Sequence, residues 1–372
     1  MSSPTTELLK TPLHQWHADN GGRLVDFAGW SMPVQYTSII EEHNACRTAV
    51  GMFDVSHMGR FYFEDPAACE FLNTLTTRRV HPMEPGKIRY SLMTNENGGV
   101  LDDVLVYHLE DSNGKAFCFM VVNASNREKI HGWLKQNGDL EKYGFEDRTT
   151  QTAMIAIQGP KALETVDPLC GTAPSSLKYY HGMITDVCGV DCIVSRTGYT
   201  GEDGCELTVP NDKAVEIWTT ILEKSSGIGG SAVGLAARDT LRLEAAMPLY
   251  GHELTEDINP AQADVNFAIN LKDRKFPGRS AIVKGKKDTT LPKRIGLEME
   301  GKRAAREHSL IFIGDQQVGE VTSGTFSPTF QKPIAMGFIK PEHTEVGTEV
   351  EIDIRGKRLP AKVCQLPFYS RS

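Results

Sequence analysis

Two adjacent carboxylates in the middle of an apolar stretch are the residues with the clearest chemical potential. Asp102 and Asp103 interrupt residues 98–107, which otherwise have the pattern of a buried β-strand. Strand side chains alternate between faces, so we expect Asp102 to share a face with Val100 and Asp103 to share the other with Leu101. Burying an unpaired carboxylate costs on the order of several kcal/mol. The pair is therefore a turn-capping or ion-paired structural acid, or is retained for a reaction or a cationic ligand.

A second group of polar residues could line a cleft for a flat, amide-bearing heterocycle with an acidic tail. Tyr199 lies in a glycine-rich turn, Glu206 follows it, and Arg238 lies in a helical stretch. Glu206 could accept two hydrogen bonds from an aminopyrimidine-like edge, and Arg238 could pair with a carboxylate. The alternative for Arg238 is a helix-surface ion pair with Asp239 or Glu244, and the sequence leaves both interpretations open.

Several other motifs are better explained by structure than by chemistry. The glycine-rich residues 227–232 follow a helical pattern, so we interpret them as a helix-to-helix connection and not as a dinucleotide-binding turn. Ser327 lacks the flanking glycines of a nucleophile elbow and is expected in a loop. For His57, alone among apolar residues, a hydrogen-bonded structural histidine is the default. Cys188 and Cys192 have no second ligand pair, so we expect no metal site.

Length and composition are those of a globular protein with room for a large site. The 372 residues exceed one typical core and suggest two or three domains. The net charge of −8 argues against a nucleic-acid partner, and no stretch approaches the roughly 20 apolar residues of a membrane span. The first residues lack the features of a secretory signal or transit peptide, and the eight cysteines are scattered. We therefore expect a cytoplasmic protein without a disulfide framework.

The elements that must position these residues are short strands interleaved with a few amphipathic helices, which predicts an α+β fold with mixed or antiparallel sheets. We expect the strand of the Asp pair to form a hairpin with residues 117–122. A helix over 127–134 should follow, with Asn123 or Ser125 as its N-cap. Further strands are expected at 152–158, 193–196 and 205–210, and helices near 161, over 214–223 and over 232–246.

A polar, lysine-rich stretch at residues 272–293 predicts a domain boundary. Beyond it, strand patterns at 317–321 and 349–354 indicate a separate β domain of about 90 residues. We therefore divide the chain into a region 1–280 and a C-terminal β domain 281–372.

Seven blocks carry a recognisable pattern, and they occur in a fixed order along the chain. They are TPL (11–13), VDFAGWSMPVQY (25–36), FDVSHM (53–58), GGVLDD (98–103), RTGYTGEDG (196–204), GLAARDTLRLEA (234–245) and SGTFSPT (323–329). Together they resemble the aminomethyltransferase, or T-protein, family of the glycine cleavage system. The resemblance extends from about residue 11 to residue 369 and leaves little added at either end.

The resemblance implies a fold of three domains around a central opening that holds tetrahydrofolate. Within region 1–280, two α+β domains are interleaved in sequence, and the second spans roughly 52–138. The third is the C-terminal domain, which is barrel-like in the family.

The resemblance also implies a reaction. In the family, an aminomethyl group carried on the lipoyl arm of H-protein loses ammonia, and its one-carbon unit passes to tetrahydrofolate, giving 5,10-methylenetetrahydrofolate. Tetrahydrofolate is a co-substrate, and the family requires no metal. By this resemblance the expected partners are lipoylated H-protein and the folate, with no nucleic acid and no membrane.

The family's catalytic aspartate corresponds to Asp103, which orients the folate and assists its nitrogen nucleophile by hydrogen bonding or proton transfer. The family's folate contacts carry over to Tyr90, Tyr107, Asn123, Tyr199, Glu206 and Arg238, and the resemblance extends to Arg294 and Tyr369. Asp103→Asn is expected to retain tetrahydrofolate but lose most turnover, whereas Asp102→Asn is expected chiefly to affect folding.

Two other functions stay open as alternatives. One is a related folate-dependent demethylase that acts on dimethylglycine, sarcosine or a methylated sulfonium compound. Dimethylglycine and sarcosine enzymes of that kind usually carry a flavin domain, for which this chain shows no motif. The other is a non-catalytic folate-binding or RNA-maturation protein. Such relatives commonly lose the acid pair or the Gly-Tyr-Thr-Gly-Glu block, and both are intact here.

Overall fold

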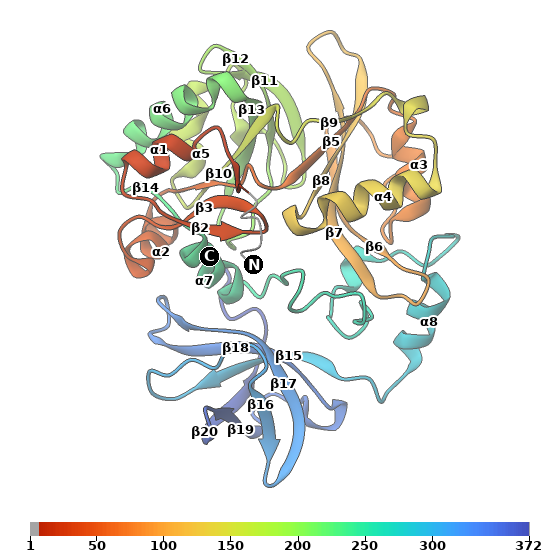
Figure 1. The fold of residues 1–372 in the computed structure, drawn as a ribbon, viewed down its shortest axis with the longest axis vertical. Helices are drawn as coiled ribbons and strands as arrows, with labels where there is room; N and C mark the ends of the chain where they lie inside the picture. The colour runs from red at the N-terminus through yellow and green to blue at the C-terminus, as the bar shows by residue number, and fades with distance from the viewer. Residues whose placement is uncertain (1–6, 372) are drawn as a thin grey trace, which may run out of the picture.

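The computed structural model describes residues 7–371 (Figure 1). The expectation of no secretory signal or transit peptide rests on the first residues of the chain. Residues 1–6 lie outside the part of the chain that the structure describes. Two α+β regions lie side by side in the upper half of Figure 1, and a β-barrel lies below them. The α+β class and the C-terminal barrel expected from the sequence are confirmed. In the described part of the chain, no helix is long and apolar enough to span a membrane.

The Asp pair lies on the second strand of an antiparallel five-stranded sheet with the order β6-β7-β8-β5-β9. The predicted hairpin is present as β7 and β8. Both faces of β7 are apolar because helices α3 and α4 cover one face and the neighbouring sheet packs on the other. The elements are β5 (Gly59–Phe63), α3 (Ala68–Leu75), β6 (Lys87–Thr94), β7 (Val100–Glu110), β8 (Ala116–Val122), α4 (Arg127–Asn137) and β9 (Phe145–Asp147).

A six-stranded sheet, on the left in Figure 1, has the order β11-β12-β13-β10-β4-β14. One face packs on α6 around the buried Trp218, and the other packs against the five-stranded sheet through Phe53, Met154, Tyr107 and Phe119. The elements are β4 (Gly51–Asp54), β10 (Thr152–Gln158), α5 (Ala162–Val166), β11 (Gly182–Val187), β12 (Val190–Ser195), β13 (Gly204–Pro210), α6 (Ala214–Ser226) and β14 (Ser231–Ala232).

The two sheets are interleaved in sequence. β4 and β10 are neighbours in the six-stranded sheet, and all five strands of the other sheet lie between them in the chain. The crossings are short, from Asp54 to Gly59 and from Asp147 to Thr152. The strands of the five-stranded sheet therefore run from residue 59 to residue 147. The predicted domain bounds, 52–138 for the second domain and 280 for the end of the folate-binding region, stay predictions.

The C-terminal strands close into a barrel with the order β15-β18-β17-β16-β19-β20. Apolar side chains from all six strands fill its interior. The strands are β15 (Lys293–Met299), β16 (Leu310–Ile313), β17 (Gln316–Ser327), β18 (Lys332–Ile339), β19 (Glu349–Ile354) and β20 (Lys357–Cys364). The remaining elements are β1 (Leu9–Lys10), α1 (His14–Asp19), β2 (Arg23–Phe27), β3 (Trp30–Gln35), α2 (Ile39–Thr48), α7 (Leu235–Glu244) and α8 (Arg279–Lys287).

Three local predictions were wrong. The helix expected over 232–246 is shorter, because β14 pairs with β4 and the chain turns at Gly234, whose N–H donates to Glu42. Neither Asn123 nor Ser125 caps α4; Asn126 occupies that position, since a 3₁₀ turn precedes the helix. Ser327 ends strand β17 rather than lying in a loop.

Candidate functional site

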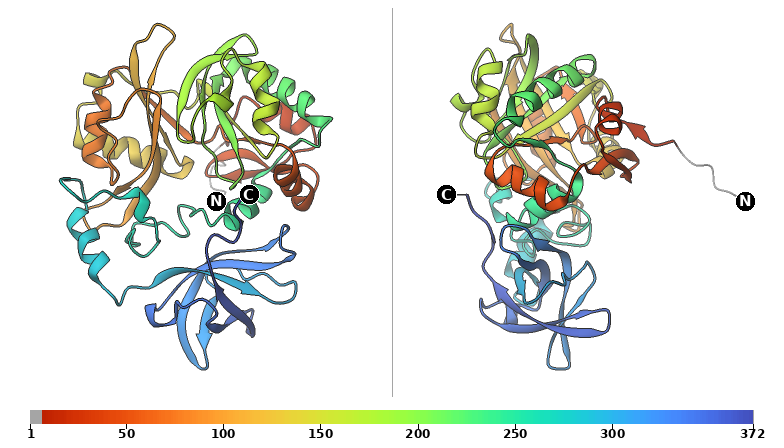
Figure 2. Two further views of the ribbon diagram at one scale, coloured as in Figure 1. Left: turned by 180° about the vertical axis from the view of Figure 1, so that it is seen from behind. Right: turned by 90° about the vertical axis from the view of Figure 1, so that its left-hand side faces the viewer.

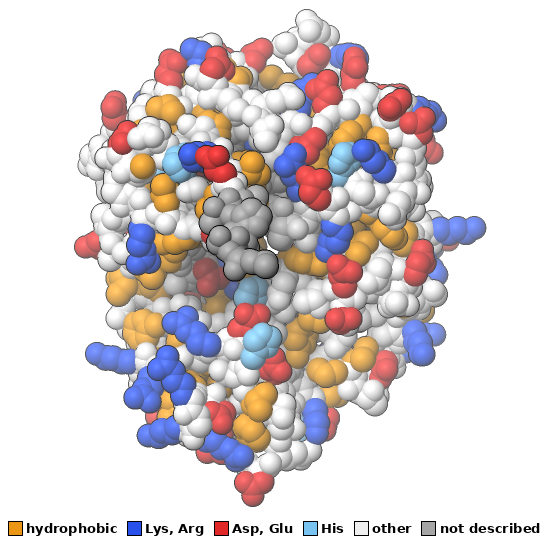
Figure 3. Space-filling model, viewed as in Figure 1, with side chains coloured by type: hydrophobic (Ala, Val, Ile, Leu, Met, Phe, Trp, Pro, Cys, Tyr) orange, Lys and Arg blue, Asp and Glu red, His pale blue; other side chains and the backbone are white. Residues whose placement is uncertain are grey.

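A cavity of about 950 Å³ lies where the two sheets, the loop after α7 and the barrel meet. Its walls come from β7, the loop after β12, α7, the segment 247–250 and barrel residues 322–324. Figure 3 shows this face hollowed between the upper regions and the barrel, with acidic and histidine side chains beside the hollow. Cavity-lining residues of those types include His252, Glu307 and His308. Segments far apart in the chain thus share one large site.

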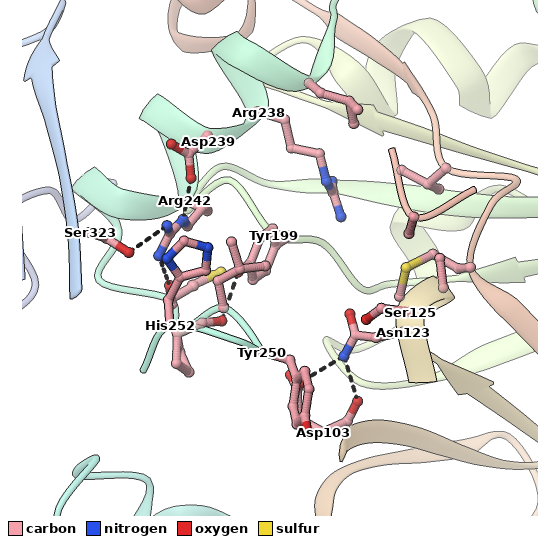
Figure 4. A pocket seen from close by; sticks show the side chains of 18 of the residues that line it. Asp103, Asn123, Ser125, Tyr199, Arg238, Asp239, Arg242, Tyr250, His252 and Ser323 are labelled. Atoms are coloured by element: carbon pink, nitrogen blue, oxygen red, sulfur yellow. Dashed lines mark hydrogen bonds and ion pairs between the residues drawn. The ribbon is translucent and has the colours of Figure 1, made fainter. Parts of the chain in front are cut away.

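The two carboxylates of β7 converge on one side-chain amide. Asn123 Nδ2 donates to Asp102 Oδ1 at 2.8 Å and to Asp103 Oδ1 at 2.7 Å. Asp102 is fully buried and also accepts from the Asn126 side chain at 2.7 Å, whereas Asp103 is partly exposed and lines the cavity. The dashed lines in Figure 4 mark the bonds from Asn123 to Asp103. The inner acid is therefore built into the fold, and the outer acid is available to a ligand.

The expected pairing of faces was wrong at one end of β7. Val100 packs with Leu92, while Leu101 packs in the same cluster as Val104. The register between β6 and β7 shifts by one residue before the acids, so Leu101 is an extra residue in the strand. Beyond this bulge the alternation is regular, and Asp103 faces the cavity.

Burial raises the pKa values of both carboxyl groups above the ordinary range of aspartate. For Asp102, the nearby charge of Asp103 raises the pKa further, and the bonds from Asn123 and Asn126 oppose this. The Tyr90 hydroxyl donates to Asp103 Oδ2 at 3.2 Å, and the ring of Tyr90 stacks on Phe267. Asp103 therefore sits among hydrogen-bond donors in a site of low polarity, where a proton can be gained or lost near neutral pH.

The opposite wall holds the second polar group. Glu206 is buried and accepts from the Thr197 hydroxyl, and burial raises its pKa. The Arg238 guanidinium lies over the Tyr199 ring, 4.8 Å from its centre, and Tyr199 donates to the carbonyl of Pro248. Arg238 Nη1 is buried without a hydrogen-bond partner among the described residues. A half-buried cation that lines a cavity and has a nitrogen without a partner is suited to an anionic or carbonyl group of a ligand.

The ion pair considered for Arg238 is not formed with either candidate in the described structure. Asp239 pairs instead with Arg242, at 2.8 Å, and Glu244 binds Arg47. Arg242 also donates to Ser323 of the barrel, so α7 is tied to the barrel beside the cavity, as Figure 4 shows. Arg238 is thus left to face the cavity.

Sequence reasoning missed His57. Its ring lines the cavity in edge-on contact with Phe27, and its Nδ1 is buried with no hydrogen-bond partner in the described residues. The expected hydrogen-bonded structural histidine was therefore wrong. Burial lowers the pKa of His57 to about 3, so the imidazole is neutral at physiological pH. The available signal was its place in the block FDVSHM, one of those that carry the resemblance.

Within residues 7–371, no cluster of three or more His, Cys, Asp or Glu side chains is arranged to hold a metal ion. Of the two cysteines weighed for a metal, Cys188 lies in the turn between β11 and β12, and Cys192 lies inside β12. All eight cysteines of the chain are free thiols.

Comparison with known proteins identifies the family. The family model for the "GCVT N-terminal domain" matches residues 13–273, and that for the "Glycine cleavage T-protein C-terminal barrel domain" matches residues 293–370. The chain belongs to the glycine cleavage T-protein family. An aminomethyltransferase of Chloroherpeton thalassium is 43% identical over 365 residues, covering 97% of this chain and 99% of that protein. An aminomethyltransferase of Geobacillus sp. is 42% identical over 369 residues, covering 98% and 100%.

The fold agrees with a solved member of the T-protein family. The crystal structure of the glycine cleavage system aminomethyltransferase T from Bartonella henselae superposes with a TM-score of 0.88 at 31% identity. The match covers 97% of this chain and 98% of the other. The barrel seen here, β15 to β20, coincides with the C-terminal family model.

Of the nine site residues implied by the T-protein resemblance, the structure brings six together around the cavity. They are Tyr90, Asp103, Asn123, Tyr199, Glu206 and Arg238. Three lie outside the cavity lining. Tyr107 is on the same face of β7 as Asp103 and Leu105, which line the cavity, but it lies further along the strand and is buried between the two sheets. Arg294 donates to the carbonyl of Ala246, and Tyr369 donates to Glu202.

Proposed function

We propose that this protein transfers the one-carbon unit of an aminomethyl group, carried on the lipoyl arm of H-protein, to tetrahydrofolate. The products are ammonia and 5,10-methylenetetrahydrofolate. The observation that carries this proposal is the cavity with Asp103 and Asn123 on one wall and Glu206 and Arg238 on the other. That arrangement suits a flat heterocycle whose reacting nitrogen lies near a carboxylate.

The residues present fit a reduced folate. Glu206 offers carboxylate oxygens to the amino and ring N–H groups of a pterin, and the free Nη1 of Arg238 offers a donor to its carbonyl. Tyr199 and Phe267 add aromatic surface to the cavity walls. The bound folate supplies a nitrogen nucleophile, and the residues that line the cavity bind the folate and accept its proton.

Asp103 is the proposed catalytic residue. Its carboxylate accepts a hydrogen bond from the folate nitrogen and takes the proton that is released when that nitrogen bonds to the methylene carbon. Two bonds of this carbon break with their electron pairs, so the amine leaves as ammonia and the lipoyl sulfur leaves as a thiol. Two folate nitrogens bond to the carbon in their place, and their two protons end on the ammonia and the thiol. Asn123 and Tyr90 hold Asp103 in place, and its raised pKa suits a group that exchanges a proton near neutral pH.

We further propose that lipoylated H-protein is the donor and that the protein works in the cytoplasm. The first rests on family membership, because the family is named for the glycine cleavage system. The second is supported by the eight free thiols, which are typical of a reducing compartment.

The test is an assay of ammonia and 5,10-methylenetetrahydrofolate with aminomethyl-loaded H-protein, run with and without tetrahydrofolate. Dimethylglycine and sarcosine serve as competing one-carbon donors. We expect folate-stimulated turnover with H-protein alone. Transfer from a small methylated donor but not from H-protein would replace the proposal with a demethylase. Folate binding without transfer from any donor would favour a non-catalytic folate-binding protein.

A further inference from the structure

A buried ion cluster lies beside the loop that carries Tyr199, outside the cavity lining. Arg47 of α2 donates from Nη1 to Glu202 at 3.0 Å and from Nη2 to Glu244, the last residue of α7, at 2.9 Å. It also donates to the carbonyl of Thr200 at 2.7 Å. The side chains of Arg47, Glu202 and Glu244 are 6%, 4% and 0% exposed. One arginine thus joins the loop to the end of α7.

The C-terminal tail completes this cluster through Tyr369. The phenol donates to Glu202 Oε1 at 2.6 Å, and the Arg47 guanidinium lies 3.8 Å above the centre of the ring. The backbone N–H of Tyr369 donates to the carbonyl of Glu244 at 2.8 Å. Burial, followed by the bond to Glu202, raises the pKa of Tyr369 to about 12, so the hydroxyl stays protonated. In Figures 1 and 2 the tail leaves the barrel and ends beside α7.

Both elements held by the cluster also carry cavity residues. Tyr199 directly precedes Thr200, whose carbonyl Arg47 binds, and Arg238 lies on the same helix as Glu244. A side chain at Gly201 would lie about 3.5 Å from the Tyr369 ring, so the tail packs directly on the loop. The contacts of Tyr369 therefore bear on two neighbouring residues of one cavity wall.

We propose that Tyr369 is a positioning residue for the folate site, which fixes the loop 197–204 and α7 through Glu202 and Arg47. Tyr199 and Arg238 are thereby held in the arrangement that receives the ligand. The inference rests on the proposed function in naming tetrahydrofolate as that ligand. Without the hydroxyl, the buried Glu202 carboxylate loses a donor, and the loop gains freedom that ligand binding must remove again. Asp103, on the opposite wall, keeps its own contacts.

The test is Tyr369→Phe, which removes the hydroxyl but keeps the ring under Arg47 and the backbone bond to Glu244. Calorimetry gives the Kd of tetrahydrofolate, the ammonia assay gives KM and kcat, and deuterium exchange reports on residues 197–204 and 235–244. We expect Kd and KM to rise about fivefold to tenfold, which is about 1 to 1.4 kcal/mol, with kcat within about twofold. Exchange should become faster in the loop.

Tyr62→Phe is the matched control, because Arg148 lies 3.4 Å above the Tyr62 ring and this pair is outside the cavity lining. It should leave Kd and exchange in the loop unchanged. Parental Kd and parental loop exchange in Tyr369→Phe would overturn the inference, whatever the change in melting temperature, as would a fall in kcat at unchanged KM. If the parent failed to release ammonia from H-protein, the proposed function would fail, and the exchange data would still decide the role of Tyr369.

Discussion

At the scale of single residues, the site depends on one amide that serves two carboxylates. Asn123 gives a hydrogen bond to each acid, and the neighbouring Asn126 gives one to the buried acid. This arrangement supplies hydrogen-bond donors to two carboxyl groups that lie close together in a buried strand. Asp102 holds the turn before α4 to β7, and Asp103 is left to face the ligand.

The raised pKa of Asp103 predicts an unusual pH dependence. Its ordinary value is 3.8, and burial raises it. Because the carboxylate form is the one that accepts the proton, activity should fall as the pH drops through the raised pKa, and so at a higher pH than for an exposed aspartate. A profile of kcat/KM from about pH 4 to about pH 9 checks this. An acid limb in the ordinary aspartate range would contradict it.

Asn126→Ala tests the structural role assigned to Asp102. The change removes one of the donors to a fully buried carboxylate, so we expect the free energy of unfolding to fall by about 1–3 kcal/mol near neutral pH. A carboxyl pKa raised on folding makes stability decline as the pH rises from the unfolded value towards the folded one. The variant raises the folded pKa further, so its deficit should be smallest and constant below the raised pKa of Asp102 in the parent, and should grow as the pH rises through that value.

Denaturant titrations at several pH values measure this difference. A deficit that stayed the same at all pH values would show that Asn126 acts on the fold without acting on the Asp102 charge.

At the scale of elements, the sequence predicts what local patterns control. The strands at 100–110, 116–122 and 152–158 and helix α6 lie where alternation and apolar spacing place them. The bulge at Leu101 could not be predicted, because it is defined by the pairing with β6. β14 escaped prediction for the same reason, since two residues pair with the distant β4. The convergence of Asp103, Glu206 and Arg238 came from the resemblance, because no local pattern brings three distant segments together.

Gly198→Ala tests the loop that carries Tyr199. A Cβ at this position would lie 1.9 Å from Oε1 of Gln158, a fully buried side chain that bonds the backbone of Thr197. We expect a loss of about 1–3 kcal/mol of stability and weaker tetrahydrofolate binding, since the loop must shift. Thermal unfolding and calorimetry measure the two effects.

Gly227→Ala is the control, because a Cβ there meets no atom within 4 Å. The helix-to-helix connection predicted at 227–232 was wrong at its end, because Ser231 and Ala232 form β14; Gly227→Ala tests whether the remaining residues 227–230 are a plain connection, which predicts parental activity. Loss of activity in Gly227→Ala, or parental behaviour in Gly198→Ala, would contradict this account of the two glycines.

At the scale of the whole molecule, the cavity lies where three bodies meet: two sheets that pack on each other through an apolar core, and a barrel joined to the end of α7 by apolar and polar contacts. Arg242 donates to Ser323 at 2.8 Å, and Ser327 and Thr329 bind Glu244. Because the cavity is lined by both α+β regions and the barrel, a ligand that fills it should stabilise all three together.

Tetrahydrofolate is therefore expected to raise the unfolding temperature of the barrel as well as of the sheets. At a concentration about 100 times Kd the gain should be about 2.7 kcal/mol. Calorimetric unfolding, together with deuterium exchange in β17 and β18, measures this with and without the ligand. Stabilisation confined to the two sheets would show that the barrel takes no part in binding.

The most direct test of the central claim is Asp103→Asn in the H-protein assay, with the Kd of tetrahydrofolate measured on the same preparation. The amide keeps the shape of the side chain but cannot take a proton, so kcat should fall by about 10² or more while Kd stays within about threefold of the parent. Turnover close to that of the parent would contradict the account, because the cavity would then perform its chemistry without the carboxylate that faces it.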